Sequence, residues 1–229
     1  MQPQHIFLSK VHSLDFIPKC EQEGFQSTYG FEKHRLIWQK GDEEFSQRLP
    51  LTLAVSADGE IRVDQDVNYI MVLVQSGSAS LGVFRGEECL EHKVFTSYMV
   101  RKKQGKSQIK HLKTKGKSRA GSRVRLASGQ AFFENINERL QRHFENYTVD
   151  RIAFSCSKIL IPHLFNAKTT PPFDKNDERI FRIPKHLHQP NYEVMMRLQR
   201  FLEKGEIILS PHQYAGFENH LKNLMNPKE

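Results

Sequence analysis

The residues of this 229-residue chain that could do chemistry gather in one basic segment punctuated by glycine. No Asp or Glu occurs in residues 93–133, whereas 12 of the 34 lysines and arginines lie there. The remaining 22 face 26 acidic residues, so the rest of the chain is net −4 although the whole chain is +8. Cations concentrated in this way point to a polyanion, most often nucleic acid.

A basic tail or a solvated surface is the alternative interpretation of this charge. The segment is internal, however, and core-like sequence flanks it on both sides, which favours a binding loop. The candidate RNA-binding residues are Arg101, Lys102, Lys103, Lys106, Lys110, Lys113, Lys115, Lys117, Arg119, Arg123 and Arg125.

Two Gly-Lys-Ser triplets, which begin at Gly105 and Gly116, invite comparison with the phosphate-binding loop of nucleotide hydrolases. That loop needs a further glycine five residues earlier, and Val100 and His111 stand at those positions. Neither triplet directly follows a predicted strand and opens a helix. We therefore predict no nucleotide cofactor.

The histidines and cysteines favour neither a metal site nor a nucleophile. His163, His186 and His188 lie in polar stretches without cysteine or carboxylate partners at ligand spacing. The three cysteines are far apart and odd in number, which predicts ordinary thiols in a reducing compartment. No serine or cysteine sits in a recognisable nucleophile elbow. The sequence thus predicts no metal and no cofactor.

Composition predicts a cytoplasmic protein with a packed core. Hydrophobic residues make up 38% of the chain, which is enough apolar material for a core. No stretch approaches the roughly 20 apolar residues of a membrane-spanning helix. The first residues also lack the charged-then-apolar pattern of a secretory signal.

The elements that must position the basic segment are predicted on both sides of it. Apolar runs at 68–75, 79–84 and 89–95 are separated by short glycine-containing turns, which predicts an antiparallel meander. After the segment, apolar residues recur at spacings of three and four from 127 to 146, which predicts an amphipathic helix. Further strands at 149–156 and 180–183 and a helix at 192–204 predict an α/β fold, a mixed sheet with flanking helices.

The predicted domain boundary lies at residue 50. We expect residues 1–50 to form an extension, α-helical or irregular, and residues 51–229 to form the α/β domain. At the start of that domain, residues 51–56 and 61–63 are expected to form two strands joined by a turn.

The basic segment resembles that of a known family. Residues 101–108 are Arg-Lys-Lys-Gln-Gly-Lys-Ser-Gln, followed by Lys-Gly-Lys at 115–117 and Ala-Gly-Ser at 120–122. This arrangement is similar to the Vms-type release-factor domain of a eukaryotic ribosome quality-control factor. That domain is related to the middle domain of the class 1 translation release factors of eukaryotes and archaea.

The resemblance covers about residues 66–204, including the Asp-Glu-Arg-Ile segment at 177–180. It departs from the family motif at Lys106, where the family has a second glycine. The ankyrin repeats and zinc finger of animal relatives are not found in this sequence, so we expect a stand-alone, bacterial member. The resemblance implies a mixed sheet with flanking helices and a long basic loop.

The resemblance also implies that Gln108 is the catalytic residue, matching the glutamine that the family inserts into the peptidyl transferase centre. A glutamine amide donates and accepts hydrogen bonds but is no acid or base at neutral pH. It could therefore orient a water or a ribose hydroxyl against an ester carbonyl. The geometry of the loop would depend on Gly105, Ser107, Gly116 and Gly121.

The implied partners are the large ribosomal subunit, its rRNA and peptidyl-tRNA, without a membrane. Two reactions fit: hydrolysis of the ester, or cleavage of the tRNA near its 3′ end with Arg101 or Lys102 neutralising the phosphate. Either reaction would free a nascent chain from a stalled large subunit. A non-catalytic factor that binds rRNA through the same loop is the alternative hypothesis, and a nuclease acting on free RNA is a third.

Overall fold

The structure is a computed structural model that describes residues 3–56, 59–97 and 117–209, with only the backbone described for 117–127. The chain divides into two compact units, Met1–Val67 with Arg197–Glu229 and Asn68–Met196. The division therefore differs from the predicted boundary at residue 50, because a strand near the C-terminus pairs with strands near the N-terminus.

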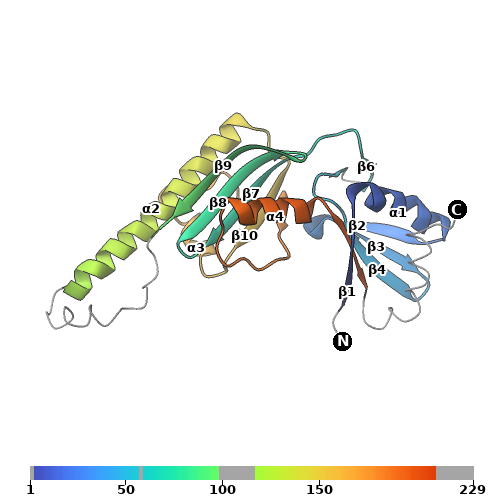
Figure 1. The fold of residues 1–229 in the computed structure, drawn as a ribbon, viewed down its shortest axis with the longest axis horizontal. Helices are drawn as coiled ribbons and strands as arrows, with labels where there is room; N and C mark the ends of the chain where they lie inside the picture. The colour runs from blue at the N-terminus through green and yellow to red at the C-terminus, as the bar shows by residue number, and fades with distance from the viewer. Residues whose placement is uncertain (1–2, 57–58, 98–116, 210–229) are drawn as a thin grey trace. The chain divides into compact units, whose positions relative to one another are not determined.

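The second unit is built on a five-stranded sheet in the order β11-β10-β7-β8-β9 (Figure 1). The meander β7, β8 and β9 is antiparallel, whereas β10 runs parallel to both β7 and β11. This mixed sheet with flanking helices confirms the predicted fold class. Its elements are β7 (Asn68–Gln75), β8 (Ser78–Arg85), β9 (Glu88–Thr96), α2 (Lys117–Asn146), β10 (Arg151–Cys156), α3 (Ile161–Phe165), β11 (Ile180–Arg182) and the start of α4 (Tyr192–Leu202).

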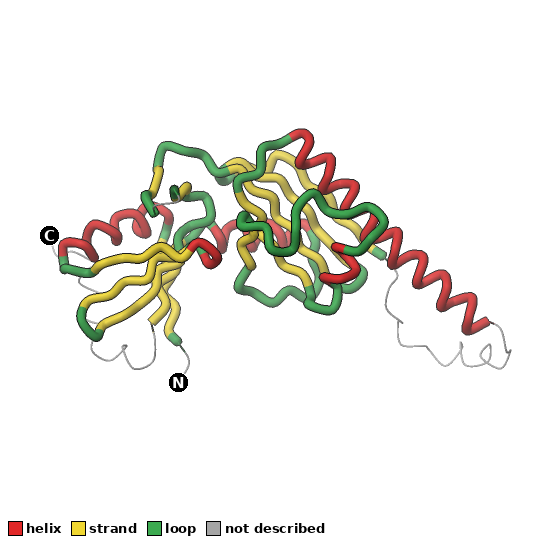
Figure 2. Tube along the Cα trace, turned by 180° about the vertical axis from the view of Figure 1, so that it is seen from behind, coloured by secondary structure: helices red, strands yellow, loops and turns green. Residues whose placement is uncertain are grey.

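Both faces of the central strands are covered, which explains their continuous apolar runs. On one face, Ile70, Val72 and Val74 of β7 pack in a core with Ile136 and Leu140 of α2. On the other face, the Ser80 hydroxyl donates to Met195 Sδ of α4 at 3.3 Å. Figure 2, the view from behind, shows α2 and α3 on the same side of the sheet.

The strand directions give the sheet two chemically different edges. Because β7, β9, β10 and β11 all run the same way, their carboxyl ends meet at one edge. The segments that follow these strands, at 76–77, at 97, at 157–160 and at 183–190, therefore share that carboxyl edge. The opposite amino edge carries the turn at 86–87 and the starts of β10 and β11.

The first unit contains an antiparallel sheet in the order β1-β12-β4-β3-β2, with helix α1 packed on it (Figure 1). Its core includes Phe16 and Cys20 of α1 and Trp38 of β3. The elements are β1 (Gln4–Leu8), α1 (Lys10–Gln22), β2 (Gln26–Gly30), the 3-10 helix η1 (Phe31–Lys33), β3 (Arg35–Lys40), β4 (Glu43–Arg48), β5 (Ala54–Val55), β6 (Ile61–Arg62) and β12 (Gly205–Leu209).

The expectation of an α-helical or irregular extension at 1–50 was wrong, because this region contributes four strands to a sheet. Gln47 shows how the sheet holds α1: its side-chain oxygen accepts from Trp38 Nε1 at 3.1 Å, and its amide nitrogen donates to the Ser13 carbonyl at 2.8 Å. A buried glutamine between polar strand residues hides the alternation from a reading of hydrophobicity alone. The strand expected at 51–56 is reduced to β5, since residues 51–53 form a turn.

Candidate nucleic-acid interface

Most of the predicted site lies outside the described residues, which omit 98–116. This holds for Gln108 and for the loop positions Gly105, Ser107 and Gly116. It also holds for the basic residues Arg101, Lys102, Lys103, Lys106, Lys110, Lys113 and Lys115. The structure instead describes the two elements between which that segment runs, β9 and α2.

Helix α2 begins at Lys117, ten residues before the predicted start. Gly121, which was expected to shape the loop, therefore lies in a stretch with helical backbone. Lysine, arginine and alanine are good helix formers, and one interior glycine costs only about 1 kcal/mol. The basic positions Lys117, Arg119, Arg123 and Arg125 thus belong to a helix rather than to a loop.

The segment is closed at its base by a contact between β9 and α2. The Ser97 hydroxyl lies 3.1 Å from the Ser128 carbonyl oxygen, to which it donates, and 2.8 Å from the Ser128 hydroxyl. The Ser97 amide donates to the Gly77 carbonyl at 2.9 Å, which extends the sheet pairing by one residue. The residues on either side of 98–127, Ser97 and Ser128, therefore meet at one point of the carboxyl edge.

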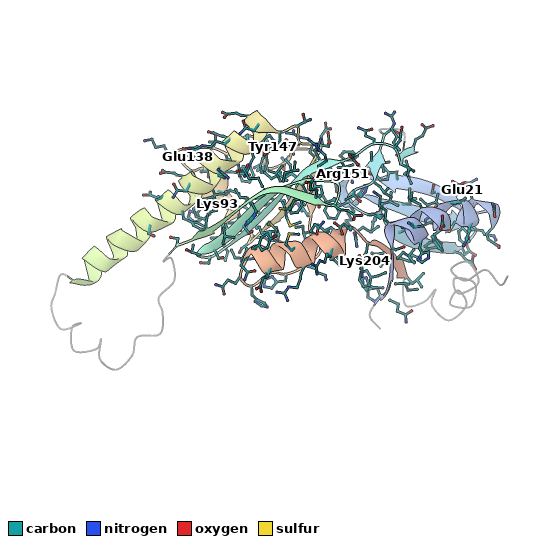
Figure 3. The ribbon with its side chains drawn as sticks, turned by 45° about the horizontal axis from the view of Figure 1, so that its top comes forward. Glu21, Lys93, Glu138, Tyr147, Arg151 and Lys204 are labelled. Atoms are coloured by element: carbon teal, nitrogen blue, oxygen red, sulfur yellow. The ribbon has the colours of Figure 1, made fainter. Side chains whose placement is uncertain are left out.

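On the C-terminal side of Ser128, an ionic cluster clamps α2 to β9. Glu91 of β9 accepts a hydrogen bond from Arg139 and lies 3.3 Å from Nδ1 of His143, both on α2. Figure 3 shows Glu138 on this part of α2 and Lys93, the first residue of the acid-free segment, on neighbouring β9. The clamp fixes the direction in which the N-terminal part of α2 leaves the sheet.

His143 is held in its neutral form by its surroundings. Its side chain is 1% exposed, and burial lowers its pKa below the ordinary 6.5, with Arg139 acting in the same direction and Glu91 against it. Among the described residues, its Nε2 has no hydrogen-bond partner. A neutral imidazole against the Glu91 carboxylate leaves Arg139 as the main cation of the clamp.

The opposite side of α2 is fixed to α3 and the segment after it. Asn137 is fully buried, and its amide nitrogen donates to the Leu164 carbonyl at 2.8 Å and to the Thr169 carbonyl at 2.7 Å. The Phe133 ring stacks on the His163 ring with centroids 5.8 Å apart. A helix held on both sides in this way is a rigid support for what precedes it.

Residues 177–180, which contributed to the resemblance, have a structural role. Arg179 donates to both carboxylate oxygens of Asp177, at 2.9 and 2.7 Å, and its guanidinium lies 5.4 Å from the Phe144 ring centroid. The pair ties the start of β11 to the end of α2. The hydrogen bonds from Arg179 hold the pKa of Asp177 below its ordinary value.

Sequence reasoning missed the residues that support the segment. Ser97, Ser128 and Glu91 carry no motif, and their roles depend on contacts of β9 and the residue after it with α2, 31 and 48 positions later. The only local signal was negative: Glu91 is the last acid before the basic segment begins.

Cysteines and metal ligands are the other groups of the described residues that could do chemistry. The three cysteines are free thiols, and burial raises the pKa of Cys20 and of Cys156 to about 12, so neither forms a thiolate readily. In the part of the chain that the structure describes, no three His, Cys, Asp or Glu side chains come together as metal ligands. Nor is any described helix both long and apolar enough to cross a bilayer.

Comparison with protein families identifies the region around the segment. The model of the Bacteroidetes VLRF1 release factor, bVLRF1, matches residues 69–209, more than half of the chain. The chain belongs to this family. The match confirms the predicted resemblance to a release-factor domain in a bacterial protein, and its range agrees closely with the 66–204 predicted from the motifs.

Comparison with solved structures gives a distant neighbour of this chain. The structure titled "Vms1 mitochondrial localization core" is similar with a TM-score of 0.41 and 11% identity, over 90% of this chain and 85% of that one. Among curated proteins, no sequence matches significantly.

Proposed function

We propose that this protein releases nascent chains from peptidyl-tRNA on stalled large ribosomal subunits, as a cytoplasmic factor of ribosome quality control. The observation that carries the proposal is the acid-free basic segment, which lies inside the region matched by a release-factor family. The contact between Ser97 and Ser128 closes this segment at the edge of a rigid sheet, as a loop that enters a partner requires.

The helix that follows the segment gives it reach. From Lys117 to Ser128, α2 continues past the carboxyl edge of the sheet (Figure 1). At about 1.5 Å per residue, these eleven steps span roughly 16 Å. In this proposal Arg119 and Arg123, whose backbone belongs to that extension, supply cations for the phosphates of rRNA or tRNA, and the lack of carboxylates avoids repulsion.

In the proposed reaction Gln108 acts by placement rather than by proton transfer. A water oxygen attacks the ester carbonyl carbon, the bond to the ribose 3′-oxygen breaks, and that oxygen leaves with a proton from the water. The Gln108 amide can accept a hydrogen bond from the water and donate one to the developing oxyanion. Such orientation and charge stabilisation lower a barrier by several kcal/mol in a site that the ribosome has already assembled.

Cleavage of the tRNA strand is the second candidate reaction, and it uses the same segment. Here a ribose 2′-hydroxyl attacks the adjacent phosphorus and displaces the 5′-oxygen of the next nucleotide, which leaves with the proton of that hydroxyl, so that a 2′,3′-cyclic phosphate remains. Arg101 or Lys102 would neutralise the charge on the phosphorane. The two reactions leave different products: a free peptide with intact tRNA, or a peptide that still carries the 3′ nucleotides.

The test is a single-turnover release assay on large subunits that carry labelled peptidyl-tRNA. Gln108→Ala is expected to slow release by at least a hundredfold, the usual cost of losing one group that stabilises the transition state. Gln104→Ala is the matched control, since it removes an identical amide four positions earlier in the same segment, and it should leave the rate within about threefold. Equal rates for Gln108→Ala and the unmodified protein would refute the catalytic assignment.

The alternative of a non-catalytic rRNA-binding factor gives a different pattern. It predicts salt-sensitive binding to large subunits without release of peptide or of tRNA fragments. A nuclease acting on free RNA would instead cut tRNA without ribosomes, and a reaction with naked tRNA as the only substrate separates it from the ribosome-dependent proposal.

A further inference from the structure

We infer that the carboxyl edge of the sheet is a second contact surface for the large subunit, where Lys158 and Lys185 bind phosphates of the rRNA beside the basic segment. The inference rests on the proposed function, since it assumes that the segment brings the protein to RNA. It adds two segments, 157–160 and 183–190, that carry no motif and lie outside the basic segment in the sequence.

The strand register brings these two segments to the same edge of the sheet as the base of the basic segment. Cys156 of β10 pairs with Val74 of β7, Gln75 pairs with Ser78 of β8, and Ser78 pairs with Thr96 of β9. Ile183 continues the pairing of β11 through a bond from its amide to the Phe154 carbonyl at 3.0 Å. Four of the sheet's strands thus end at one edge, across roughly 19 Å at about 4.8 Å per strand.

The carboxyl edge is basic. The segment 157–165 contains Lys158 and His163 and no acid, and the segment 183–192 contains Lys185, His186 and His188 and again no acid. All five of these side chains are exposed. The rings of His186 and His188 lie 4.9 Å apart, edge to face, as imidazoles that can also stack on an unpaired base.

The amino edge of the same unit has the opposite character. Its turns and strand starts carry the acids Glu87, Glu88, Asp150, Asp174, Asp177 and Glu178. The same edge carries the four cations Arg85, Arg151, Lys175 and Arg179, of which Arg179 pairs with Asp177, so its net charge is −2. A polyanion attracts the basic edge and repels the acidic edge. It should therefore orient the sheet so that the basic edge, on the side of the basic segment, faces the polyanion.

The width of the edge favours rRNA over the tRNA end as its partner. The tRNA 3′ end is a single short strand, which the segment itself suffices to meet. A surface about 19 Å wide that lies behind a helix extension of about 16 Å fits a broad, folded RNA surface. The partner is therefore the phosphate backbone of the large-subunit rRNA around the site that the segment enters.

The experiment measures binding of the whole chain to purified bacterial large subunits without tRNA, over a range of KCl concentrations. Each lost phosphate contact should lower the slope of log affinity against log salt by about 0.7 to 0.9. At 0.1 M salt this corresponds to a loss of affinity of about five- to eightfold per contact. We expect this for Lys158→Gln and for Lys185→Gln, and roughly twice the slope change for the double variant.

The matched controls remove the same charge at the amino edge. Lys175→Gln and Arg85→Gln change exposed cations there and should leave affinity and slope within error. Lys102→Gln with Lys103→Gln tests the basic segment in parallel. Melting curves establish that each variant is folded, which we expect because every substituted side chain of known placement is exposed.

Three results would overturn the inference. In the first, the Lys158 and Lys185 variants bind like the amino-edge controls while the Lys102 and Lys103 substitutions weaken binding. That result refutes rRNA binding by the carboxyl edge and leaves the proposed function intact. An effect seen only on subunits that carry peptidyl-tRNA refutes the assignment to rRNA. If the unmodified protein does not bind large subunits at all, both the edge and the proposed function are wrong.

Discussion

The contact between Ser97 and Ser128 gives a sharp prediction because its two hydroxyls are not equivalent. Ser97→Ala removes both interactions of the Ser97 hydroxyl, to the Ser128 carbonyl and to the Ser128 hydroxyl. Ser128→Ala removes only the second, since the backbone carbonyl remains as an acceptor. The base of the segment should therefore depend more on Ser97.

The expected sizes follow from this asymmetry. A hydrogen bond contributes a net 0.5–1.5 kcal/mol, so Ser97→Ala should lower the free energy of unfolding by about 1 kcal/mol. Ser128→Ala loses part of that but gains about 0.5 kcal/mol in helix propensity, which leaves a change near zero. In the double variant the second substitution loses nothing more, so the cost should fall to about 0.5 kcal/mol, below that of Ser97→Ala alone.

Denaturant unfolding and hydrogen exchange measure the cycle. The Ser97 amide, bonded to the Gly77 carbonyl, should exchange about fivefold faster in Ser97→Ala, the factor that corresponds to 1 kcal/mol. Release from stalled subunits at limiting protein should fall by a similar factor, because the contact at the base of the segment becomes less stable. Ser76→Ala, an exposed serine in the turn at the same edge, is the matched control and should change neither quantity.

Two results would contradict the reasoning. If the two single substitutions simply add in the double variant, the hydroxyls do not interact. If Ser128→Ala lowers the free energy of unfolding more than Ser97→Ala does, the Ser97 hydroxyl is not the main group of this contact.

Three further predictions concern the support of the sheet. Gly82→Ala would place a methyl group 2.7 Å from both Met195 Sδ and a Phe84 ring carbon, so urea unfolding should show a loss of about 1–3 kcal/mol; an unchanged midpoint would mean that α4 shifts freely. Burial lowers the pKa of His143, so the unfolded state binds more protons, and the stability that is present above about pH 6.5 is lost as the pH falls. His143→Gln should therefore make the free energy of unfolding depend less on pH between pH 7.5 and 5. An unaltered slope would show that another group titrates. Arg179 lowers the pKa of Asp177, so Asp177→Asn should lower the free energy of unfolding by about 1 kcal/mol at pH 7. The loss should become smaller as the pH falls through that lowered pKa. A loss that does not depend on pH would point to packing instead.

Local pattern was enough for the central sheet. The apolar run of β7 was predicted with the bounds that the structure has, and β8 and β9 were predicted within one residue at either end. Tight turns at Gly77 and Gly86, both with positive φ, mark the ends of these strands in the sequence because glycine adopts that conformation at no steric cost. The helix α4 likewise followed from its spacing of apolar residues, although it ends at Leu202 rather than at 204.

The start of α2 and the first unit could not be predicted from pattern alone. Residues 117–126 contain basic residues, serine and one glycine, which resemble a loop because no apolar stripe identifies a buried face. The sheet of the first unit joins β1 and β4 to β12, more than 150 positions away. Pairing over such a distance is decided by the packing of a whole core and leaves no local periodicity.

The sequence by itself determined the charge of the basic segment, its motif and the release-factor family to which the chain belongs. Only the tertiary structure decided what holds that segment, because Ser97 meets Ser128 and Glu91 meets Arg139 through the folding of α2 onto β9. The same holds for the carboxyl edge, where Lys158 and Lys185 share a surface only because parallel strands end together. Charge and residue type are properties of the chain, whereas which charges lie side by side depends on strand register.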